Sequence, residues 1–169
     1  MAELVILNGP PGVGKTTVAA ILRRFAPGTV IISGDALRAF APEDARAHLG
    51  GGATYRAASA LAATYARLGA ARVVFEYVFL RRTHFDYFRE AIPEAVVPHV
   101  VTLWAPLEIV LAREKARIGP ARIGHAARDC YREMEGNLAV LGEIVETASL
   151  SAESAAVRVH ELSPQRVAP

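Results

Sequence analysis

The chain has 169 residues, of which 52% are hydrophobic and 21% are charged, with 13 Gly and 10 Pro. A chain of this size and composition buries enough surface to fold without a metal ion or a disulfide. Its one cysteine, Cys130, excludes a disulfide framework and a cysteine-based zinc cluster. We therefore expect a single domain over residues 1–169.

The charge balance and the N-terminus predict a cytoplasmic protein. Nineteen basic residues against 17 acidic ones leave a formal net charge of +2, which is weak support for a nucleic-acid partner. No apolar run reaches the roughly 18 residues that a membrane helix needs, and the start does not resemble a signal peptide. We expect no membrane partner, and the sequence leaves the oligomeric state open.

Strand and helix patterns alternate along the chain. Short apolar runs predict buried strands at 4–7, 30–32, 72–75 and 99–104, and a last strand is predicted at 157–160. Apolar residues at helical spacing follow the first strand, lie between residues 58 and 68 ahead of a capping Gly69, and follow Pro106. A later helix is predicted to carry Cys130, Met134, Leu138, Leu141 and Val145 on one face. This order indicates an α/β fold in which helices cover both faces of a parallel sheet.

The residues from Gly9 to Thr16 fit the pattern G-x-x-x-x-G-K-[ST], between the first strand and its helix. Backbone amides of such a loop converge on phosphate oxygens at a helix N-terminus, and the glycines allow close approach. We expect Lys15 to contact the β- and γ-phosphates of ATP and the Thr16 hydroxyl to bind Mg²⁺. The predicted nucleotide-binding residues of the loop are Gly9, Gly12, Val13, Gly14, Lys15, Thr16 and Thr17.

Ligands of open parallel sheets bind at the carboxyl ends of the strands. Asp35 follows the second strand, and Arg38 lies one helical turn further on. We predict that Asp35 accepts the proton of an attacking hydroxyl and that Arg38 holds a polar or anionic part of the acceptor. The alternative is that Asp35 is a helix N-cap and Arg38 is solvated.

Glu76 ends the third strand and is a predicted Mg²⁺ ligand and acceptor contact, the alternative being a carboxylate paired with an arginine. Six aromatic residues lie between positions 75 and 88, and alternate residues of a strand face inward. Core packing and a cleft wall for a ring-bearing acceptor explain this cluster equally well. We place Tyr77, Phe79 and Arg81 among the acceptor contacts.

Five cations and a single acid lie between Arg113 and Arg128, around Gly119, Pro120 and Gly124. This composition predicts an arginine-bearing lid over about residues 117–125, which closes over the nucleotide and excludes water. Arg117 and Arg122 are the predicted catalytic arginines, and Arg113 and Arg117 are predicted to bind the nucleotide. The alternative is a solvated helix face. The five histidines show no metal-ligand spacing, and we interpret them as incidental.

With these residues in place, the chain resembles the small P-loop kinases of the chloramphenicol phosphotransferase group and, more distantly, zeta-toxin and polynucleotide-kinase domains. The resemblance lies in residues 5–9 leading into the phosphate loop, Asp35 after the second strand, residues 69–72 and 78–80, and residues 112–117. It implies a three-layer α/β/α P-loop NTPase fold with a five-stranded parallel sheet, a general base at Asp35 and nucleotide-binding lid arginines. This chain departs from the group in having Glu76-Tyr77 where the antibiotic kinase has two acids, and in a shorter acceptor segment, about residues 41–53.

Together these patterns predict an ATP- and Mg²⁺-dependent kinase that phosphorylates a hydroxyl of a small molecule, an antibiotic among the candidates. A polynucleotide 5′-hydroxyl kinase is the alternative enzyme, favoured by Arg38, Arg81 and Arg82 and opposed by the small net charge. The alternative of another class is a nucleotide-gated binding module without chemistry, against which Asp35 argues.

Overall fold

Five parallel strands form the sheet at the centre of the chain. The computed structural model describes residues 2–116 and 124–163, and the strand order is β2-β3-β1-β4-β5. Every pair of neighbouring strands is parallel. The predicted five-stranded parallel sheet is confirmed. The strands are β1 (Glu3–Asn8), β2 (Thr29–Ser33), β3 (Arg72–Glu76), β4 (His99–Trp104) and β5 (Glu143–Glu146).

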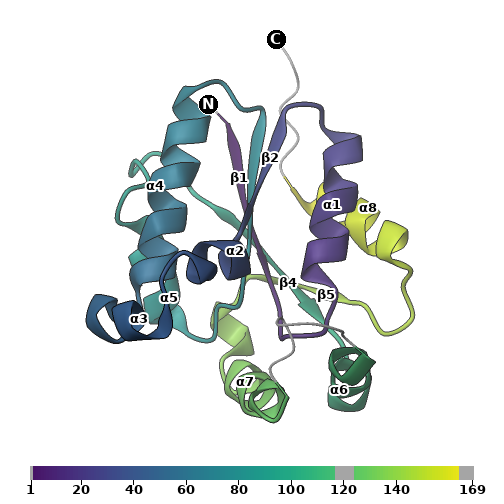
Figure 1. Ribbon diagram of the computed structural model, residues 1–169. Helices are drawn as coiled ribbons and strands as arrows, with labels where there is room; N and C mark the ends of the chain where they lie inside the picture. The colour runs from purple at the N-terminus through teal and green to yellow at the C-terminus, as the bar shows by residue number, and fades with distance from the viewer. Residues whose placement is uncertain (1, 117–123, 164–169) are drawn as a thin grey trace.

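Helices cover both faces of this sheet, which confirms the predicted three layers. In Figure 1, α4 and α5 lie on one side of the strands, α1 and α8 on the other, and α6 and α7 at the lower end. The helices are α1 (Lys15–Phe25), α2 (Gly34–Ala39), α3 (Glu43–Leu49), α4 (Ala53–Arg67), α5 (Arg82–Arg89), α6 (Leu107–Ala116), α7 (Ala126–Glu135) and α8 (Ala152–Leu162), with a 3₁₀ turn at Leu138–Val140.

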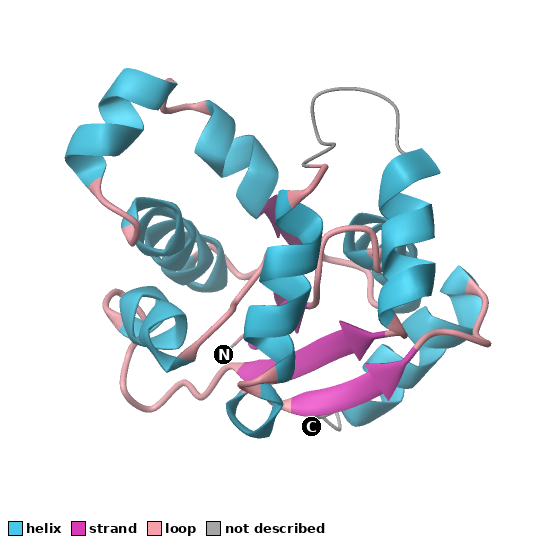
Figure 2. Cartoon of the chain, turned by 90° about the horizontal axis from the view of Figure 1, so that it is seen from below, coloured by secondary structure: helices cyan, strands magenta, loops and turns pink. Residues whose placement is uncertain are grey.

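The core follows from the alternation of side chains along the central strands. Val5 and Leu7 of β1 pack into the cluster that includes α1 and α8, whereas Leu4 and Ile6 pack into the cluster that includes α4. Both faces of β1 are therefore buried, as is typical of a parallel sheet between helical layers. Because all five strands are parallel, their carboxyl ends lie at one edge of the sheet, toward the lower end of Figure 1. Figure 2 views the molecule from below and shows the strands between the helices.

The predicted strand at 157–160 is wrong, because this segment belongs to α8. Ala155, Ala156 and Val159 are buried at helical spacing, and the Ser151 hydroxyl caps the helix by accepting a hydrogen bond from the Ser154 amide. The fifth strand lies earlier, at Glu143–Glu146, within the stretch that we expected to be helical. The predicted helix of that region ends at Glu135, so Leu138, Leu141 and Val145 lie beyond it.

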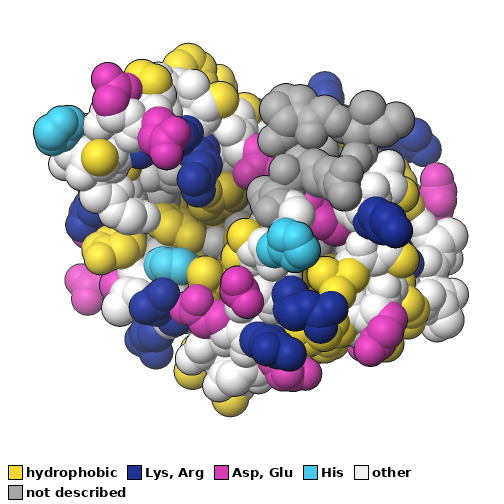
Figure 3. All heavy atoms as spheres, turned by 60° about the horizontal axis from the view of Figure 1, so that its bottom comes forward, with side chains coloured by type: hydrophobic (Ala, Val, Ile, Leu, Met, Phe, Trp, Pro, Cys, Tyr) yellow, Lys and Arg dark blue, Asp and Glu magenta, His cyan; other side chains and the backbone are white. Residues whose placement is uncertain are grey.

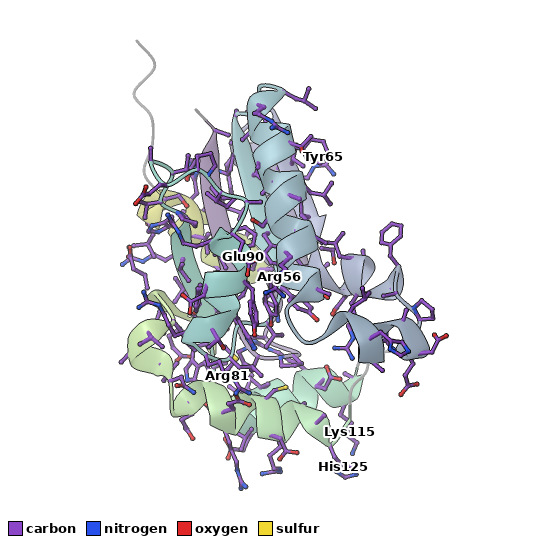
Figure 4. All side chains as sticks on the ribbon, turned by 90° about the vertical axis from the view of Figure 1, so that its left-hand side faces the viewer. Arg56, Tyr65, Arg81, Glu90, Lys115 and His125 are labelled. Atoms are coloured by element: carbon purple, nitrogen blue, oxygen red, sulfur yellow. The ribbon has the colours of Figure 1, made fainter. Side chains whose placement is uncertain are left out.

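The face of α4 that packs on the sheet also differs from the expectation. Tyr55, Ala58, Ser59 and Ala62 are its buried residues, whereas Leu61, Tyr65 and Leu68 are exposed. Figure 4 shows Tyr65 on the outer side of this helix. Small residues let α4 lie close to the sheet, and a pattern of large apolar residues does not reveal them. Gly69 does end the helix as predicted: its φ is +92°, and the Ala70 amide donates to the Tyr65 carbonyl in a Schellman motif.

Two short helices occupy the region between β2 and α4. The turn at Gly50–Gly52 joins α3 to α4. The stretch at about residues 41–53, which we predicted to contact the acceptor, is therefore mostly helical. Among the described residues, no helix is both long and apolar enough to cross a membrane.

Candidate active site

The phosphate loop joins β1 to α1, as its sequence predicts. Gly14 is the N-cap of α1 and has a φ of +108°, a conformation that L side chains rarely adopt. A Cβ on Gly9 would lie 2.6 Å from the Leu103 carbonyl oxygen, and one on Gly12 would lie 2.7 Å from that of Val110. Gly9 and Gly12 are thus required by packing against β4 and α6, while the Cβ direction of Gly14 is open.

Lys15 lies across this loop. Its ammonium group donates hydrogen bonds to the carbonyl oxygens of Gly9 at 2.8 Å and Pro10 at 3.2 Å. These contacts hold the cation at the mouth of the loop, where phosphate oxygens meet the amides of a helix N-terminus. The geometry supports the predicted role of Lys15 at the phosphates.

Thr16 and Glu76 come together from α1 and the end of β3. The Thr16 hydroxyl donates to Glu76 Oε1 at 3.3 Å, although the two residues are 60 positions apart in the chain. Glu76 is 4% exposed, and burial raises the pKa of its carboxyl group, opposed by the Ser33 hydroxyl, the Lys15 charge and the Thr16 hydroxyl. A hydroxyl and a carboxylate beside a phosphate loop fit Mg²⁺, which keeps several waters and takes few protein ligands. No cluster of three acidic, histidine or cysteine residues that could hold a metal occurs within 2–116 and 124–163.

Asp35 lies in the first turn of α2 and is not its N-cap. Ser33 is the N-cap, and its hydroxyl accepts a hydrogen bond from the Ala36 amide at 3.5 Å. Asp35 is exposed and faces the cleft beside the phosphate loop. The alternative that Asp35 serves as the cap is therefore wrong, and its carboxylate can interact with a molecule in the cleft.

Arg38 is held toward the same cleft by Tyr77. A hydrogen bond with the Tyr77 side chain is the largest cause that raises the pKa of Arg38, and Asp35 raises it further. The Tyr77 ring in turn lies directly over Gly34, so closely that a Cβ at this position would overlap it. Gly34 is therefore needed to seat Tyr77, and Tyr77 orients Arg38.

One cleft of about 580 Å³ runs along the carboxyl ends of the strands and contains most of the predicted site. On one side of Lys15 it is lined by Asp35, Arg38, Tyr55, Tyr77, Val78, Leu80 and Cys130, which we call the acceptor half. On the other side the lining is Arg113, Thr147, Leu150, Ser151, Ala152 and Ala155, which we call the nucleobase half. Figure 3 brings this end forward and shows hydrophobic side chains in the hollowed part of the surface.

Two predicted acceptor contacts lie elsewhere. Phe79 is fully buried and stacks on Phe85, with ring centroids 4.6 Å apart, so it belongs to the core. Arg81 forms an ion pair of 2.7 Å with Glu133 of α7 and does not line the cleft. Figure 4 shows Arg81 between the upper part of the molecule and α7. The predicted lid residues Arg117 and Arg122 lie outside the described residues.

The nucleobase half contains residues that the sequence did not predict for the site, from the segment after β5. Arg113, a predicted nucleotide residue, donates to the Thr147 carbonyl at 3.3 Å and to the Val13 carbonyl at 3.4 Å, so it connects the phosphate loop to the segment after β5. That segment was not predicted, because its strand was read as a helix. Ser151 before an Ala-rich helix was the available signal, since it is a typical N-cap. Cys130, expected in the core, is half-buried at the acceptor half.

Comparison with known proteins gives one family and a set of similar structures. A family model described as an AAA domain matches residues 4–134. A sugar kinase from a Janibacter species has a TM-score of 0.67 at 18% identity, over 96% of this chain and 94% of that chain. The tunicamycin resistance protein of Deinococcus radiodurans has a TM-score of 0.69 at 19% identity, over 95% and 94%.

A gluconokinase from Sinorhizobium meliloti has a TM-score of 0.63 at 21% identity, over 94% of each chain. At these identities the similarity shows the fold. A comparison with curated proteins gives no match.

Proposed function

The chain belongs to the AAA domain family, and on that premise we propose that it transfers the γ-phosphoryl group of ATP to a hydroxyl group of a small molecule. The observation that carries this proposal is the continuity of the cleft. A single cavity joins the phosphate loop at Lys15 to the carboxylate of Asp35 and the guanidinium of Arg38. A nucleotide and an acceptor that fill the two halves would meet at Lys15 and Thr16.

The residues supply positioning and charge, which is most of what phosphoryl transfer requires. The Asp35 carboxylate would accept the proton of the acceptor hydroxyl as its oxygen bonds to phosphorus, while the bond from phosphorus to the ADP oxygen breaks. Lys15 neutralises charge on the β- and γ-phosphates. When bound, Mg²⁺ would be held by Thr16 and Glu76 and would screen the charge on the phosphates.

The acceptor half favours a molecule with a ring or another apolar body. Tyr55, Tyr77, Val78 and Leu80 give it an aromatic and aliphatic wall, and its charged groups are Asp35 and Arg38. Such a wall suits an apolar alcohol with one polar or anionic group, a hydroxylated antibiotic being one example. The tunicamycin resistance protein, the sugar kinase and the gluconokinase share this fold, and the acceptor is the open part of the proposal.

The polynucleotide 5′-hydroxyl kinase remains the second candidate, supported by Arg38 in the cleft. Arg81 and Arg82, which favoured it, form ion pairs with Glu133 at 2.7 Å and with Asp86 at 3.6 Å. A nucleic-acid acceptor would bind with an affinity that falls steeply with salt, whereas a small neutral alcohol would not.

A screen by mass spectrometry tests the proposal. Hydroxylated antibiotics, nucleosides and short oligonucleotides are incubated with the protein, ATP and Mg²⁺, and a gain of one phosphoryl group is sought. The expected result is phosphorylation of a small ring-bearing alcohol that is lost in Asp35→Asn. Tight ATP binding with no phosphorylated acceptor in any class would instead favour the binding module that uses a nucleotide without chemistry.

A further inference from the structure

The acceptor half is built on a segment that has no secondary structure of its own. Residues 77–80 follow β3 and belong to no helix or strand. The side chains of Val78 and Leu80 line the cleft, while Phe79 between them is fully buried in the core. The Tyr77 amide still donates to the Leu7 carbonyl of β1 at 3.2 Å, whereas the main chain of residues 78–80 takes its hydrogen-bond partners from side chains elsewhere.

Asn8 provides two of these partners from the end of β1. Its Oδ1 accepts from the Phe79 amide at 2.7 Å, and its Nδ2 donates to the Phe79 carbonyl at 3.2 Å. Nδ2 also donates to the Thr102 hydroxyl at 3.0 Å. Asn8 is fully buried and directly precedes the phosphate loop, so the same residue fixes the start of that loop and the middle of the acceptor wall.

Tyr55 and His84 hold the residues on either side of Phe79. The Tyr55 hydroxyl donates to the Val78 carbonyl at 2.7 Å, and His84 Nδ1 accepts from the Leu80 amide at 3.0 Å. The two rings stack, with centroids 4.6 Å apart and an interplanar angle of 22°. We call Asn8, Tyr55 and His84 the backbone clamp, since they contact the main chain of three successive residues.

The bond to Leu80 defines the protonation state of His84. A backbone amide can only donate, so Nδ1 carries the lone pair and the ring proton is on Nε2. A protonated imidazolium has no lone pair that could accept the Leu80 N–H, and its Nδ1 proton would compete for the Tyr55 hydroxyl oxygen, 3.0 Å away. The contact with Leu80 therefore exists only while His84 is neutral.

The surroundings of His84 favour this neutral form. Burial lowers the pKa of His84 below its usual 6.5, the charge of Arg81 lowers it further, and Glu133 raises it. Arg81 comes from the segment after the wall, Glu133 and Cys130 from α7, and Tyr55 from α4. At pH 7 and above His84 is neutral and the clamp is complete. In acid His84 is protonated and its hydrogen bond with the Leu80 amide is lost.

We propose that neutral His84 is a positioning residue for the acceptor: with Asn8 and Tyr55 it holds residues 78–80 so that Val78 and Leu80 form the acceptor wall. This inference rests on the proposed phosphotransferase function. It predicts that acceptor binding weakens in acid as His84 takes up a proton. At any one pH, ATP binding should be the same in the parent and in variants of His84, because the phosphate-loop contacts of Lys15 do not involve His84.

Three variants separate the parts of the clamp. His84→Asn places an amide oxygen close to the Nδ1 position and does not titrate, whereas His84→Phe keeps the stacked ring and loses the acceptor. His48→Asn makes the same change at an exposed histidine of α3 and is the matched control. Each protein is studied between pH 5 and pH 8 by hydrogen exchange of the Leu80 amide, by ATP titration and by steady-state kinetics.

The parent and His48→Asn should protect the Leu80 amide at pH 7.5 and lose that protection in acid. In His84→Phe the Leu80 amide should be unprotected at both pH values. At pH 7.5 it should exchange roughly 5- to 100-fold faster than in the parent, the effect of leaving an amide without a partner. His84→Asn should retain the protection at both pH values. The KM for the acceptor that the screen identifies should follow the same order, rising about 5- to 20-fold in His84→Phe, with the KM for ATP unchanged.

Two results would overturn the inference. Equal Leu80 protection in His84→Phe and the parent would show that the clamp does not hold the wall. Lost protection with an unchanged acceptor KM would make His84 merely structural. Absence of any phosphorylated acceptor in the parent protein would instead overturn the proposed function itself, and the positioning role with it.

Discussion

At the scale of the single residue, Lys15 offers the most direct test of the nucleotide site. Lys15→Ala removes the cation that the Gly9 and Pro10 carbonyls hold at the mouth of the phosphate loop. We expect turnover to fall below detection and ATP binding to weaken, because charge on the β- and γ-phosphates is no longer neutralised. Lys115→Ala, at an exposed lysine of α6 that does not line the cleft, is the control. Equal activity and ATP affinity in the two variants would contradict the phosphate role.

Asp35 is the residue whose role the fold clarifies most. Because Ser33 caps α2, Asp35→Asn and Asp35→Ala should both melt within a few degrees of the parent. Both should lose roughly 10² to 10⁴ in turnover, the effect of removing a general base, while ATP titration stays nearly unchanged. Asp44→Asn removes an exposed first-turn carboxylate from α3 and is the matched control. If Asp35→Asn turns over like Asp44→Asn, the base is another group, with Glu76 the next candidate.

Burial of the charged Glu76 carboxylate lowers the stability of the fold, while the same carboxylate is the proposed Mg²⁺ ligand. Its pKa is raised by burial, so the folded state binds its proton more tightly than the unfolded state does. Its contribution to stability is therefore present below the unfolded pKa and is lost as pH rises through the folded pKa. We expect Glu76→Gln to raise the melting temperature at pH 8 without Mg²⁺, and to abolish both turnover and the stabilisation by Mg²⁺ with ATP. A lower melting temperature at pH 8, measured by calorimetry, would mean that the charged carboxylate stabilises the fold.

At the scale of the element, the junction of β2 and α2 depends on one glycine. A Cβ at Gly34 would overlap the Tyr77 ring, so Gly34→Ala must displace the ring that orients Arg38. We expect a loss of about 1–3 kcal/mol in the free energy of unfolding and a higher acceptor KM. Gly51→Ala, which has open space around its Cβ, is the control.

A double variant makes this test specific. Tyr77→Ala removes the ring that the new methyl group meets, so Gly34→Ala should cost much less stability in that background. Additive losses of unfolding free energy, measured by urea titration, would show that the two residues do not interact.

At the scale of the whole molecule, the two edges of the sheet separate stability from chemistry. The cleft lies at the carboxyl edge, whereas Arg72 and Glu3 form a 2.7 Å ion pair at the amino edge, with side chains 4% and 12% exposed. His160 of α8 accepts from Arg72 at 3.2 Å, which ties the last helix to this pair. Breaking a buried ion pair leaves an uncompensated charge.

We therefore expect Glu3→Ala to lower the free energy of unfolding by about 3 kcal/mol. ATP affinity and turnover per folded molecule should stay the same at 20 °C, because the substitution is at the opposite edge from the phosphate loop. Arg158→Ala, which breaks an exposed ion pair of α8, should have almost no effect on stability. Reduced ATP affinity in Glu3→Ala would show that the two edges are coupled.

The sequence by itself determined those features in which neighbouring residues carry the information. The loop from Gly9 to Thr16 needs a strand, glycines at fixed offsets and a helix start, all within one short stretch, so its position between β1 and α1 was predicted correctly. The first four strands were equally readable, because strands buried on both faces are continuous apolar runs. The Schellman ending at Gly69 followed from one glycine.

Only the tertiary structure decided what depends on residues distant in the chain. Val157 and Val159 favour a strand locally, but burial of Ala155, Ala156 and Val159 on one side makes the segment α8. Packing against partners far along the chain outweighs a local strand preference, whose full range between residue types is only about 1 kcal/mol. Likewise, Arg81 forms an ion pair with Glu133 and does not line the cleft. Neutral His84 contacts the Leu80 amide of the acceptor wall because β1, α4 and α5 meet there. Such pairings are set by the three-dimensional fold, since no spacing along the sequence records them.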